Sequence, residues 1–347
     1  MSSIRNPAAE VAVLFSAEER RLELHEEVRL GLTSRPKELP PKWFYDRRGS
    51  ELFDAITRLP EYYLTRAERS ILERHAGEIA ELTDATTLIE LGSGTSEKTR
   101  LLLDTLAPRR FVPFDVSEET LRSSAQRLAL RYPALEITAL VGDFERPLPP
   151  LPPGEPRLLA FLGSTIGNLA PTRRTVFLND VTAALDDDDW FLLGVDLVKS
   201  PARLVAAYDD ASGVTREFNL NVLRVLDREL GGDFDVSAFE HVARWNAEAE
   251  WMEMFVRSVR EQTVRFEALE LEVAFEAGEL MRTEISAKFH LQRLADELEG
   301  AGLSTQRWWT DDAGDFAVLL ATPTDRAMRP ARFELATSAS AGQRSIP

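Results

Sequence analysis

Between residues 67 and 196 the chain alternates short, almost wholly apolar segments with longer segments that place apolar residues at helical spacing. Continuous apolar runs are typical of strands buried on both faces, and the helices between such strands cover the two faces of a parallel sheet. The alternation therefore predicts an α/β fold. The expected strands lie within 87–91, 109–117, 135–144, 156–169 and 189–198.

The alternation stops after residue 196 and resumes near residue 289. The block 197–288 combines helical segments with strands that alternate apolar and polar residues. Residues 289–323 then give an amphipathic helix and two strands around a short Asp/Gly turn. A five-strand α/β unit completed by a helix and an antiparallel strand pair is the plan of a Rossmann-like class I methyltransferase domain.

We expect the intervening block to be a second, α+β domain that is discontinuous in the chain. The N-terminal residues lie outside the alternation and are expected to pack with that block. The C-terminal tail is rich in Ala, Ser and Arg, a composition that favours disorder. The expected organisation is a second, substrate-binding domain 1–66 and 197–288, a methyltransferase domain 67–196 and 289–323, and a disordered tail 324–347.

The segment TLIELGSGTSEKTR (87–100) carries a Gly-x-Gly turn directly after an apolar strand. Gly92 and Gly94 allow the backbone to approach a ligand closely, and the helix that follows offers free N–H groups. A dinucleotide-binding turn would need a third glycine, but Glu97 stands at that position. A carboxylate beside a pyrophosphate is unfavourable, so the turn favours a different nucleotide ligand.

Acidic residues at the ends of three predicted strands indicate S-adenosylmethionine as that ligand. Glu90 precedes the first glycine and suits the ammonium and sulfonium groups. Asp115 is placed to accept hydrogen bonds from the ribose hydroxyls, and Asp143 from the adenine amino group while Phe144 stacks on the ring. A purely structural interpretation would make these acids helix caps, but their ordered placement favours the cofactor site.

Composition limits the other functions that the chain could have. Its 347 residues include no cysteine and carry a net charge of −17, so disulfides and thiolate chemistry are excluded and nucleic acid or anionic lipid would be repelled. The four histidines lack metal-binding spacing, so no metal is expected. No stretch reaches the roughly 18 apolar residues of a membrane span, and no signal-peptide pattern begins the chain. We expect a cytoplasmic monomer.

Several long motifs resemble those of the L-histidine Nα-methyltransferases of ergothioneine biosynthesis. They are LPPKWFYDRRGSELFDAITRLPEYYLTRAE (39–68), LIELGSGTSEKTRLLLD (88–104), FLGSTIGNL (161–169), LLGVDLVK (192–199), AYDDASGVT (207–215), FNLNVL (218–223) and WWTDDAGDF (308–316). The resemblance covers the chain from about residue 20 to about residue 322. It implies that S-adenosylmethionine trimethylates the α-amine of L-histidine to give hercynine, on a methyltransferase domain with a discontinuous second domain.

The resemblance also implies roles for residues that the nucleotide turn alone does not identify. Tyr62 and Lys98 match the groups that hold the methionine end of the cofactor beside Gly92. Asn168 and Tyr208 match the ligands of the amino-acid backbone.

On the substrate side, Tyr45 and Phe53 match residues of the substrate pocket, Glu284 and Ser286 match the pair that binds the imidazole, and Met254 matches a residue that lines that pocket. Residues two apart on a strand point to the same face, so Glu284 and Ser286 can both reach one ring. A carboxylate suits a ring N–H, and a hydroxyl can serve the other ring nitrogen.

The chemistry gives Tyr45 and Asn168 a catalytic role. A sulfonium is already a strong electrophile, so the protein needs no nucleophile and must chiefly align an amine with the methyl carbon. The amine has to lose a proton before each attack. Neutral polar groups such as Tyr45 and Asn168 can orient the nitrogen and pass its proton to water.

Other interpretations stay open on the sequence. The chain could methylate another small amine or amino acid, be a nicotinamide-dependent oxidoreductase, or bind S-adenosylmethionine without catalysis. The absent third glycine opposes the second, and a whole inserted domain opposes the third. The aromatic residues and Met254 could also be plain core side chains.

Overall fold

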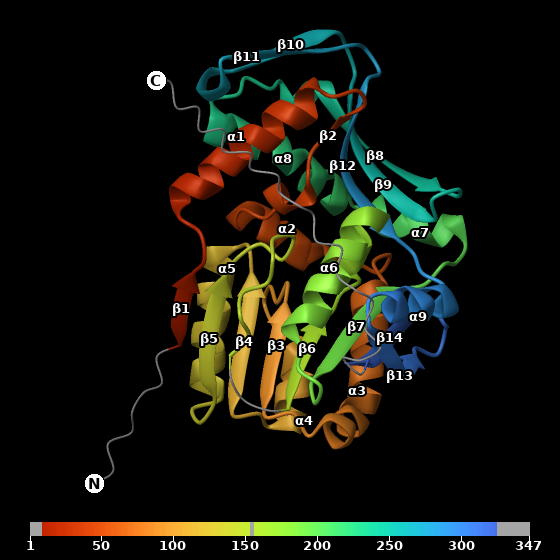
Figure 1. Cartoon of the computed structure of the whole chain (residues 1–347). Helices are drawn as coiled ribbons and strands as arrows, with labels where there is room; N and C mark the ends of the chain where they lie inside the picture. Colours follow the sequence, from red (N-terminus) through yellow and green to blue (C-terminus); the bar gives the residue numbers. More distant parts are fainter. Residues whose placement is uncertain (1–8, 153–155, 325–347) are drawn as a thin grey trace, which may run out of the picture.

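The computed structural model describes residues 9–152 and 156–324. Within these residues a large sheet forms the lower part of the molecule in Figure 1, and a smaller sheet forms the upper part together with several helices. The chain passes between the two parts more than once, because β2 and β12 belong to the smaller sheet while β3 to β7 and β14 belong to the larger one.

The large sheet has the strand order β1-β5-β4-β3-β6-β7-β14-β13. Neighbouring strands pair in parallel, except that β14 is antiparallel to both β7 and β13. This arrangement confirms the predicted class I methyltransferase fold. The strands are β1 (Glu10–Val13), β3 (Thr87–Leu91), β4 (Arg110–Asp115), β5 (Glu136–Val141), β6 (Arg157–Phe161), β7 (Trp190–Asp196), β13 (Leu303–Thr310) and β14 (Phe316–Pro323).

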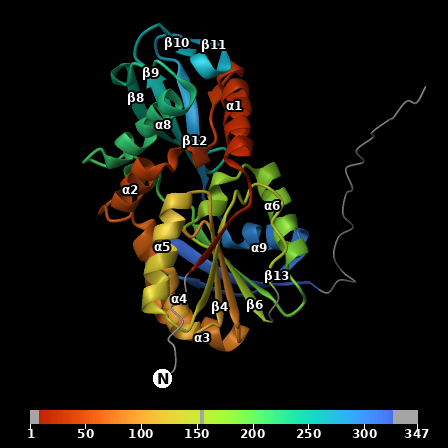
Figure 2. The ribbon, with the colours of Figure 1, turned by 90° about the vertical axis from the view of Figure 1, so that its left-hand side faces the viewer.

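Helices cover both faces of this sheet, with α5 on one side and α6 and α9 on the other in Figure 2. Successive residues of β3 serve the two faces: Leu88 packs in the cluster that includes α3, α4 and α5, and Ile89 in the cluster that includes α6 and α9. This double burial is why β3 reads as a continuous apolar run. The helices are α3 (Leu64–Thr83), α4 (Thr99–Leu106), α5 (Glu118–Arg131), α6 (Pro171–Ala184) and α9 (Leu291–Gly300).

The smaller sheet has the order β2-β12-β9-β8, and α7 and α8 pack against β8 and β9. Alternate residues of β9 are buried, as expected for a sheet with one covered face. Its elements are β2 (Lys37–Glu38), β8 (Phe239–Asn246), β9 (Trp251–Ser258), β12 (Leu280–Ala287), α7 (Pro201–Tyr208) and α8 (Val214–Leu230). The hairpin β10 (Gln262–Phe266) and β11 (Leu271–Phe275), helices α1 (Ala17–Thr33) and α2 (Arg47–Ile56), and the 3-10 helices Pro41–Phe44, Thr165–Asn168, Val236–Ala238 and Glu267–Leu269 complete the described chain.

One N-terminal segment differs from the expectation. We expected the first 66 residues to pack with the inserted block, but β1 pairs in parallel with β5 and extends the large sheet at its edge. Strand β5 would otherwise present unpaired backbone groups there, and a short apolar strand satisfies them. The remaining domain boundaries stay a prediction, and the expected disordered tail lies, from residue 325 on, outside the described residues.

Helix α2 is held against α8 by its N-cap. The Asp46 carboxylate accepts the Gly49 N–H at 2.7 Å, and it also accepts from Asn221 at 2.9 Å and from Arg228 at 2.8 Å, both on α8. Gly49 allows the first turn of α2 to approach the backbone of Phe44 closely, since a Cβ at Gly49 would lie 1.7 Å from the Phe44 carbonyl oxygen. These contacts fix the first turn of α2.

We expect Gly49→Ala to lower the free energy of unfolding by ~1–3 kcal/mol, because the added methyl group forces the backbone of α2 away from Phe44. Gly77→Ala is the matched control. Gly77 is an exposed residue inside α3 whose added Cβ meets no described atom within 4 Å, so this change should stabilise by ~0.5–1 kcal/mol. Chemical denaturation measures both, and equal effects would contradict the described packing.

Candidate active site

The pocket lies where the strand order of the large sheet reverses. From β3 the chain goes to β4 and β5 on one side, and later to β6 and β7 on the other. Such a switch point leaves a crevice outside the carboxyl ends of the strands, where ligands of α/β sheets bind. The Gly-x-Gly turn follows β3 at this point, so the topology alone directs attention to it.

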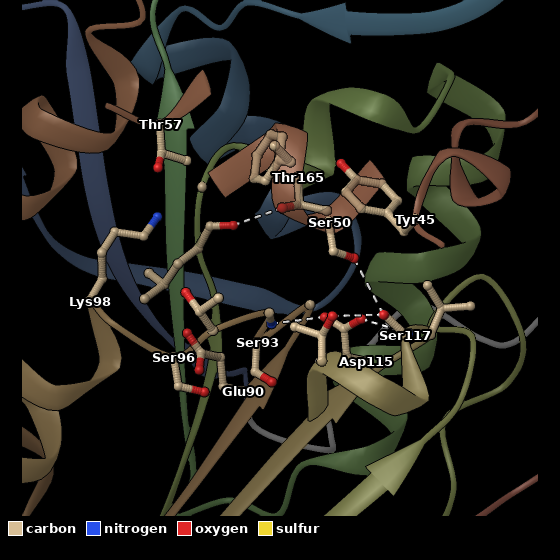
Figure 3. Close-up of a pocket in the computed structure, with 18 of the residues that line it drawn as sticks. Tyr45, Ser50, Thr57, Glu90, Ser93, Ser96, Lys98, Asp115, Ser117 and Thr165 are labelled. Carbon is tan, nitrogen blue, oxygen red and sulfur yellow. Dashed lines mark hydrogen bonds between the residues drawn. The ribbon is translucent and has the colours of Figure 1, made fainter. Parts of the chain in front are cut away.

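Figure 3 shows this pocket, with Glu90, Ser93, Ser96 and Asp115 on the side of the large sheet and Tyr45, Ser50 and Thr165 opposite them. All the residues that we predicted to bind the cofactor line it, together with three of those predicted for the substrate. These residues are Tyr62, Glu90, Gly92, Gly94, Lys98, Asp115, Asp143 and Phe144, and Tyr45, Phe53 and Asn168.

The backbone of the glycine turn has the conformation that its glycines permit. Gly92 has φ 66° and Gly94 has φ 49°, both in the left-handed region that side chains disfavour. The Gly94 N–H donates to Asp115 at 2.8 Å, so the end of β4 fixes the turn that follows β3. Contacts within the chain therefore hold the turn in this conformation.

Glu90 is an unusual residue, because it is a carboxylate in the middle of the sheet with only 3% of its surface exposed. Burial raises its pKa to about 8, although a hydrogen bond donated by Thr99 and the charge of Lys98 act in the opposite direction. A cation beside it would restore the ionised form. Glu90 is thus suited to a cationic ligand.

Asp115 and Asp143 present carboxylate oxygens at the ends of β4 and β5. Asp115 accepts the N–H groups of Gly94 and Ser117, each at 2.8 Å. Asp143 accepts the Glu145 N–H at 2.8 Å and the Lys42 ammonium at 2.9 Å. Each carboxylate oxygen has two lone pairs, so both groups keep acceptor capacity for a ligand.

Two residues that sequence reasoning missed hold predicted ligands in place. Glu68, fully buried on α3, pairs with Lys98 and accepts the Gly163 N–H at 2.7 Å. Lys42 pairs with Asp143 and also with Glu23 and Glu27 of α1, at 2.7 and 2.8 Å. Both lie in the segment 39–68, far from the nucleotide turn in sequence. No local signal distinguishes them, because other charged residues such as Arg47 and Arg66 lie close to them in the same segment.

The pocket also contains unsatisfied hydroxyl groups. The Oγ atoms of Ser93 and Ser96, both buried in the glycine turn, have no hydrogen-bond partner among the described residues. Buried polar groups of this kind are rarely left unpaired in a native protein. Two free hydroxyls beside Glu90 and Asp115 fit a small, polar, cationic ligand, so the residues present are compatible with S-adenosylmethionine.

A row of aromatic rings connects this pocket to the smaller sheet. The ring centroids of Tyr45 and Phe53 lie 5.7 Å apart, those of Phe53 and Tyr62 6.3 Å, and those of Tyr62 and Tyr208 6.4 Å. Burial raises the pKa of all three tyrosines well above its ordinary value, so their hydroxyls stay protonated. The Tyr208 hydroxyl donates to Ser286 Oγ at 2.8 Å.

The remaining predicted substrate residues lie beyond this row and do not line the same pocket. Glu284 pairs with Met254 across β12 and β9, and Ser286 pairs with Met252. A β-bulge between Arg282 and Glu284 shifts the register, so that Met281, Glu284 and Ser286 follow one another along one face. Burial raises the pKa of Glu284 to about 8.

The 3-10 helix Thr165–Asn168 brings the two groups of residues together. A Cβ added to Gly167 would lie 2.8 Å from the Ala287 carbonyl oxygen and 3.5 Å from Ser286 Oγ. The backbone that presents Asn168 to the pocket therefore packs directly on the end of β12. The predicted substrate residues of β12 thus lie next to the loop that carries Asn168, although they do not line the cofactor pocket.

The sheet order and the acidic glycine turn define a Rossmann-like S-adenosylmethionine-dependent methyltransferase. The chain belongs to the family of SAM-dependent, histidine-specific methyltransferases, whose model matches residues 24–323. The predicted class of enzyme and its cofactor are thereby confirmed.

The names of proteins that are similar to this chain are consistent with this family. The chain is 55% identical over 302 residues to the histidine N-alpha-methyltransferase of Mycolicibacterium smegmatis. The matched region covers 86% of this chain and 94% of that protein. It is 56% identical over 304 residues to the enzyme of the same name from Mycobacterium tuberculosis, with 86% and 95% covered. It is also 36% identical over 205 residues to ergothioneine biosynthesis protein 1 of Neurospora crassa, with 56% of this chain and 23% of that protein covered.

We expect Asp115→Ala to weaken S-adenosylmethionine binding roughly tenfold to a hundredfold, because hydrogen bonds to an ionised acceptor contribute about 1.5–3 kcal/mol. Asp54→Ala is the matched control, since Asp54 also lines the pocket but pairs with Arg58. Calorimetry measures both affinities. Unchanged binding by the Asp115 variant would remove this residue from the cofactor site.

Cofactor binding should release a proton from Glu90. Its pKa of about 8 keeps it largely protonated at neutral pH, and a bound cation lowers that pKa by favouring the carboxylate. Affinity should therefore rise with pH up to about 8. Titration calorimetry in buffers of different ionisation enthalpy measures the released proton. Glu90→Gln should abolish the Glu90 contribution; an identical proton release in wild type and variant would contradict the assignment.

Proposed function

We propose that this chain transfers methyl groups from S-adenosylmethionine to the α-amino group of L-histidine until hercynine is formed, a step of ergothioneine biosynthesis. The observation that supports the proposal is that the 3-10 helix bearing Asn168, which lines the cofactor pocket, packs against the end of β12 beside Ser286, in a chain of the histidine-specific methyltransferase family. S-adenosylmethionine supplies an electrophilic methyl group when it is bound.

We assign the cofactor end of the site to residues of the large sheet. Glu90 and Lys98 face the charged methionine end with Tyr62 beside them, Gly92 and Gly94 give backbone access, and Asp115 accepts the ribose hydroxyls. Asp143 and Phe144 hold the adenine. Phe144 is well placed for stacking, since it is already fixed by edge-on contacts with Phe161 and Phe177 at centroid distances of 5.1 and 6.1 Å.

Tyr45 and Asn168 orient the attacking amine. Both line the pocket, and the raised pKa of Tyr45 keeps its hydroxyl neutral. A phenol that stays protonated cannot remove a proton as a base, so Tyr45 positions the nitrogen while the proton passes to water. Repeated methylation then depends on holding the nitrogen in line with the methyl group rather than on a strong base.

We assign Glu284 and Ser286 to the binding of the imidazole. Met254, Phe53 and Tyr208 form the boundary of the substrate site. Among the described residues none donates a hydrogen bond to the Glu284 carboxyl, whereas a ring N–H would supply one and lower its raised pKa. The row of rings from Tyr45 to Tyr208 lies between the cofactor pocket and Ser286.

The proposal includes a cytoplasmic, monomeric enzyme. None of the described helices combines the length and the low charge that crossing a membrane requires.

The direct test of the proposal is mass spectrometry of a reaction that contains S-adenosylmethionine and a pool of the proteinogenic amino acids. Histidine should gain the mass of three methyl-for-hydrogen replacements. A gain on another amino acid, with histidine unchanged, would overturn the proposed substrate and leave the class of enzyme intact.

We expect Glu284→Ala to lower kcat/KM for L-histidine by ~10- to 150-fold, because a ring N–H then lacks its charged acceptor in a dry pocket, a loss of about 1.5–3 kcal/mol. Cofactor affinity should not change, since Glu284 does not line the cofactor pocket. Glu253→Ala, one residue from Met254 on the opposite face of β9, is the matched control. Full turnover by the Glu284 variant would show that the ring binds elsewhere.

A further inference from the structure

Lys288 is a buried lysine to which none of the foregoing roles applies. It follows β12 directly, and its side chain and that of Asp196, at the carboxyl end of β7, are both fully buried. Lys288 Nζ lies 3.0 Å from Asp196 Oδ2, and the next N–H in the chain, that of Phe289, donates to the Asp196 carbonyl at 2.9 Å. Lys288 therefore stands where the two sheets join.

The ammonium of Lys288 has three hydrogens and three acceptors. Besides Asp196 it donates to Tyr208 Oη at 2.8 Å and to Ser286 Oγ at 2.9 Å. An ammonium has no acceptor capacity, so both hydroxyl oxygens must act as acceptors toward it. Two residues that we assign to the substrate thus share one buried cation as their hydrogen-bond donor.

This arrangement determines what Ser286 can offer to a ligand. Its oxygen accepts from Lys288 and also from the Tyr208 hydroxyl at 2.8 Å. A serine hydroxyl has two acceptor lone pairs and one hydrogen. With both lone pairs engaged, only the hydrogen is left, so Ser286 faces a ligand as a donor.

We propose that Lys288 is a positioning residue that fixes Ser286 as a hydrogen-bond donor and thereby selects a ring nitrogen that carries a lone pair. This proposal rests on the proposed function. Glu284, on the same face of β12, is the acceptor for the second ring nitrogen. A donor and an acceptor side by side bind one tautomer of neutral imidazole. If the ligand ring contains no nitrogen, both the Ser286 donor and the Glu284 acceptor lack a hydrogen-bond partner.

The role of Lys288 can be tested by substitution, because Asp196 keeps other hydrogen-bond partners when the Lys288 ammonium is removed. Tyr63 Oη donates to its two carboxylate oxygens at 2.9 and 2.8 Å, and Lys199 pairs with it as well. Lys288→Met therefore removes the donor to Ser286 and Tyr208 without leaving Asp196 unpaired. Lys199→Met is the matched control, since Lys199 contacts Asp196 and Tyr63 but neither substrate hydroxyl.

The first experiment is calorimetry in the presence of S-adenosylhomocysteine with two ligands, L-histidine and 3-(2-thienyl)-L-alanine, whose ring has a similar shape and no nitrogen. Lys288→Met should weaken histidine binding about tenfold and thienylalanine binding by less than about twofold, so that selectivity falls. Lys199→Met should keep the wild-type selectivity. Equal weakening of both ligands by Lys288→Met would show a merely structural role and would overturn the proposal.

A double-mutant cycle tests whether Lys288 acts through Ser286. Ser286→Ala and Lys288→Met should each lower kcat/KM for histidine. The kcat/KM of the double variant should lie within about twofold of that of the more impaired single variant. Full additivity of the two losses would contradict the proposal. If wild type itself does not methylate histidine, the proposed function fails instead, so the two failures are distinguishable.

Nuclear magnetic resonance of wild type provides a readout that does not depend on any variant folding. L-histidine labelled with 15N in its ring, bound together with S-adenosylhomocysteine, should show one protonated and one unprotonated nitrogen, that is, a single neutral tautomer. A doubly protonated ring would leave Ser286 no lone pair to donate to and would overturn the proposal.

Discussion

The rest of the site depends on the hydrogen bonds and ion pairs of the Asp196 carboxylate. It lies fully buried at the end of β7 and binds Tyr63 at the start of α3, Lys199 in the following loop and Lys288 at the end of β12. Its backbone N–H donates to Ser164 at 2.9 Å in the loop that leads to Asn168. A charge so buried is stable only because several donors surround it. One residue thus connects the large sheet, the smaller sheet and the loop between them, and fixes the distance between cofactor pocket and substrate wall.

Much of this architecture follows from local sequence. Strand β3 is buried on both faces, so its apolar run identified a parallel sheet, and the glycines after it are needed for a turn with positive φ. Glu90, Asp115 and Asp143 could be predicted because the ends of parallel strands meet at one edge of the sheet, whatever lies between them in sequence. The substrate residues Asn168, Tyr208 and Met254 came from the resemblance of their motifs, since no local pattern distinguishes them from core or loop residues.

Features that depend on contacts between distant segments were not predictable. The pairing of β1 with β5 is set by an edge that forms only when the sheet does. The bulge that brings Met281 onto the face of Glu284 and Ser286 is a matter of register with β9, and a simple two-residue period does not reveal it. Glu68, Lys42 and Lys288 each pair with a residue far away in the chain, namely Lys98, Asp143 and Tyr208, which lie 30, 101 and 80 positions away. Their burial and these pairings therefore appear only in the folded structure.

The central claim is that one cleft between the two sheets holds the cofactor on the glycine turn and the imidazole on β12. The most direct measurement is a crystal structure of the enzyme with S-adenosylhomocysteine and L-histidine. The account predicts the ribose against Asp115, the α-nitrogen facing Tyr45 and Asn168, and the ring between Glu284 and Ser286. A histidine whose ring lies away from β12, with Ser286 contacting only Tyr208 and Lys288, would contradict it.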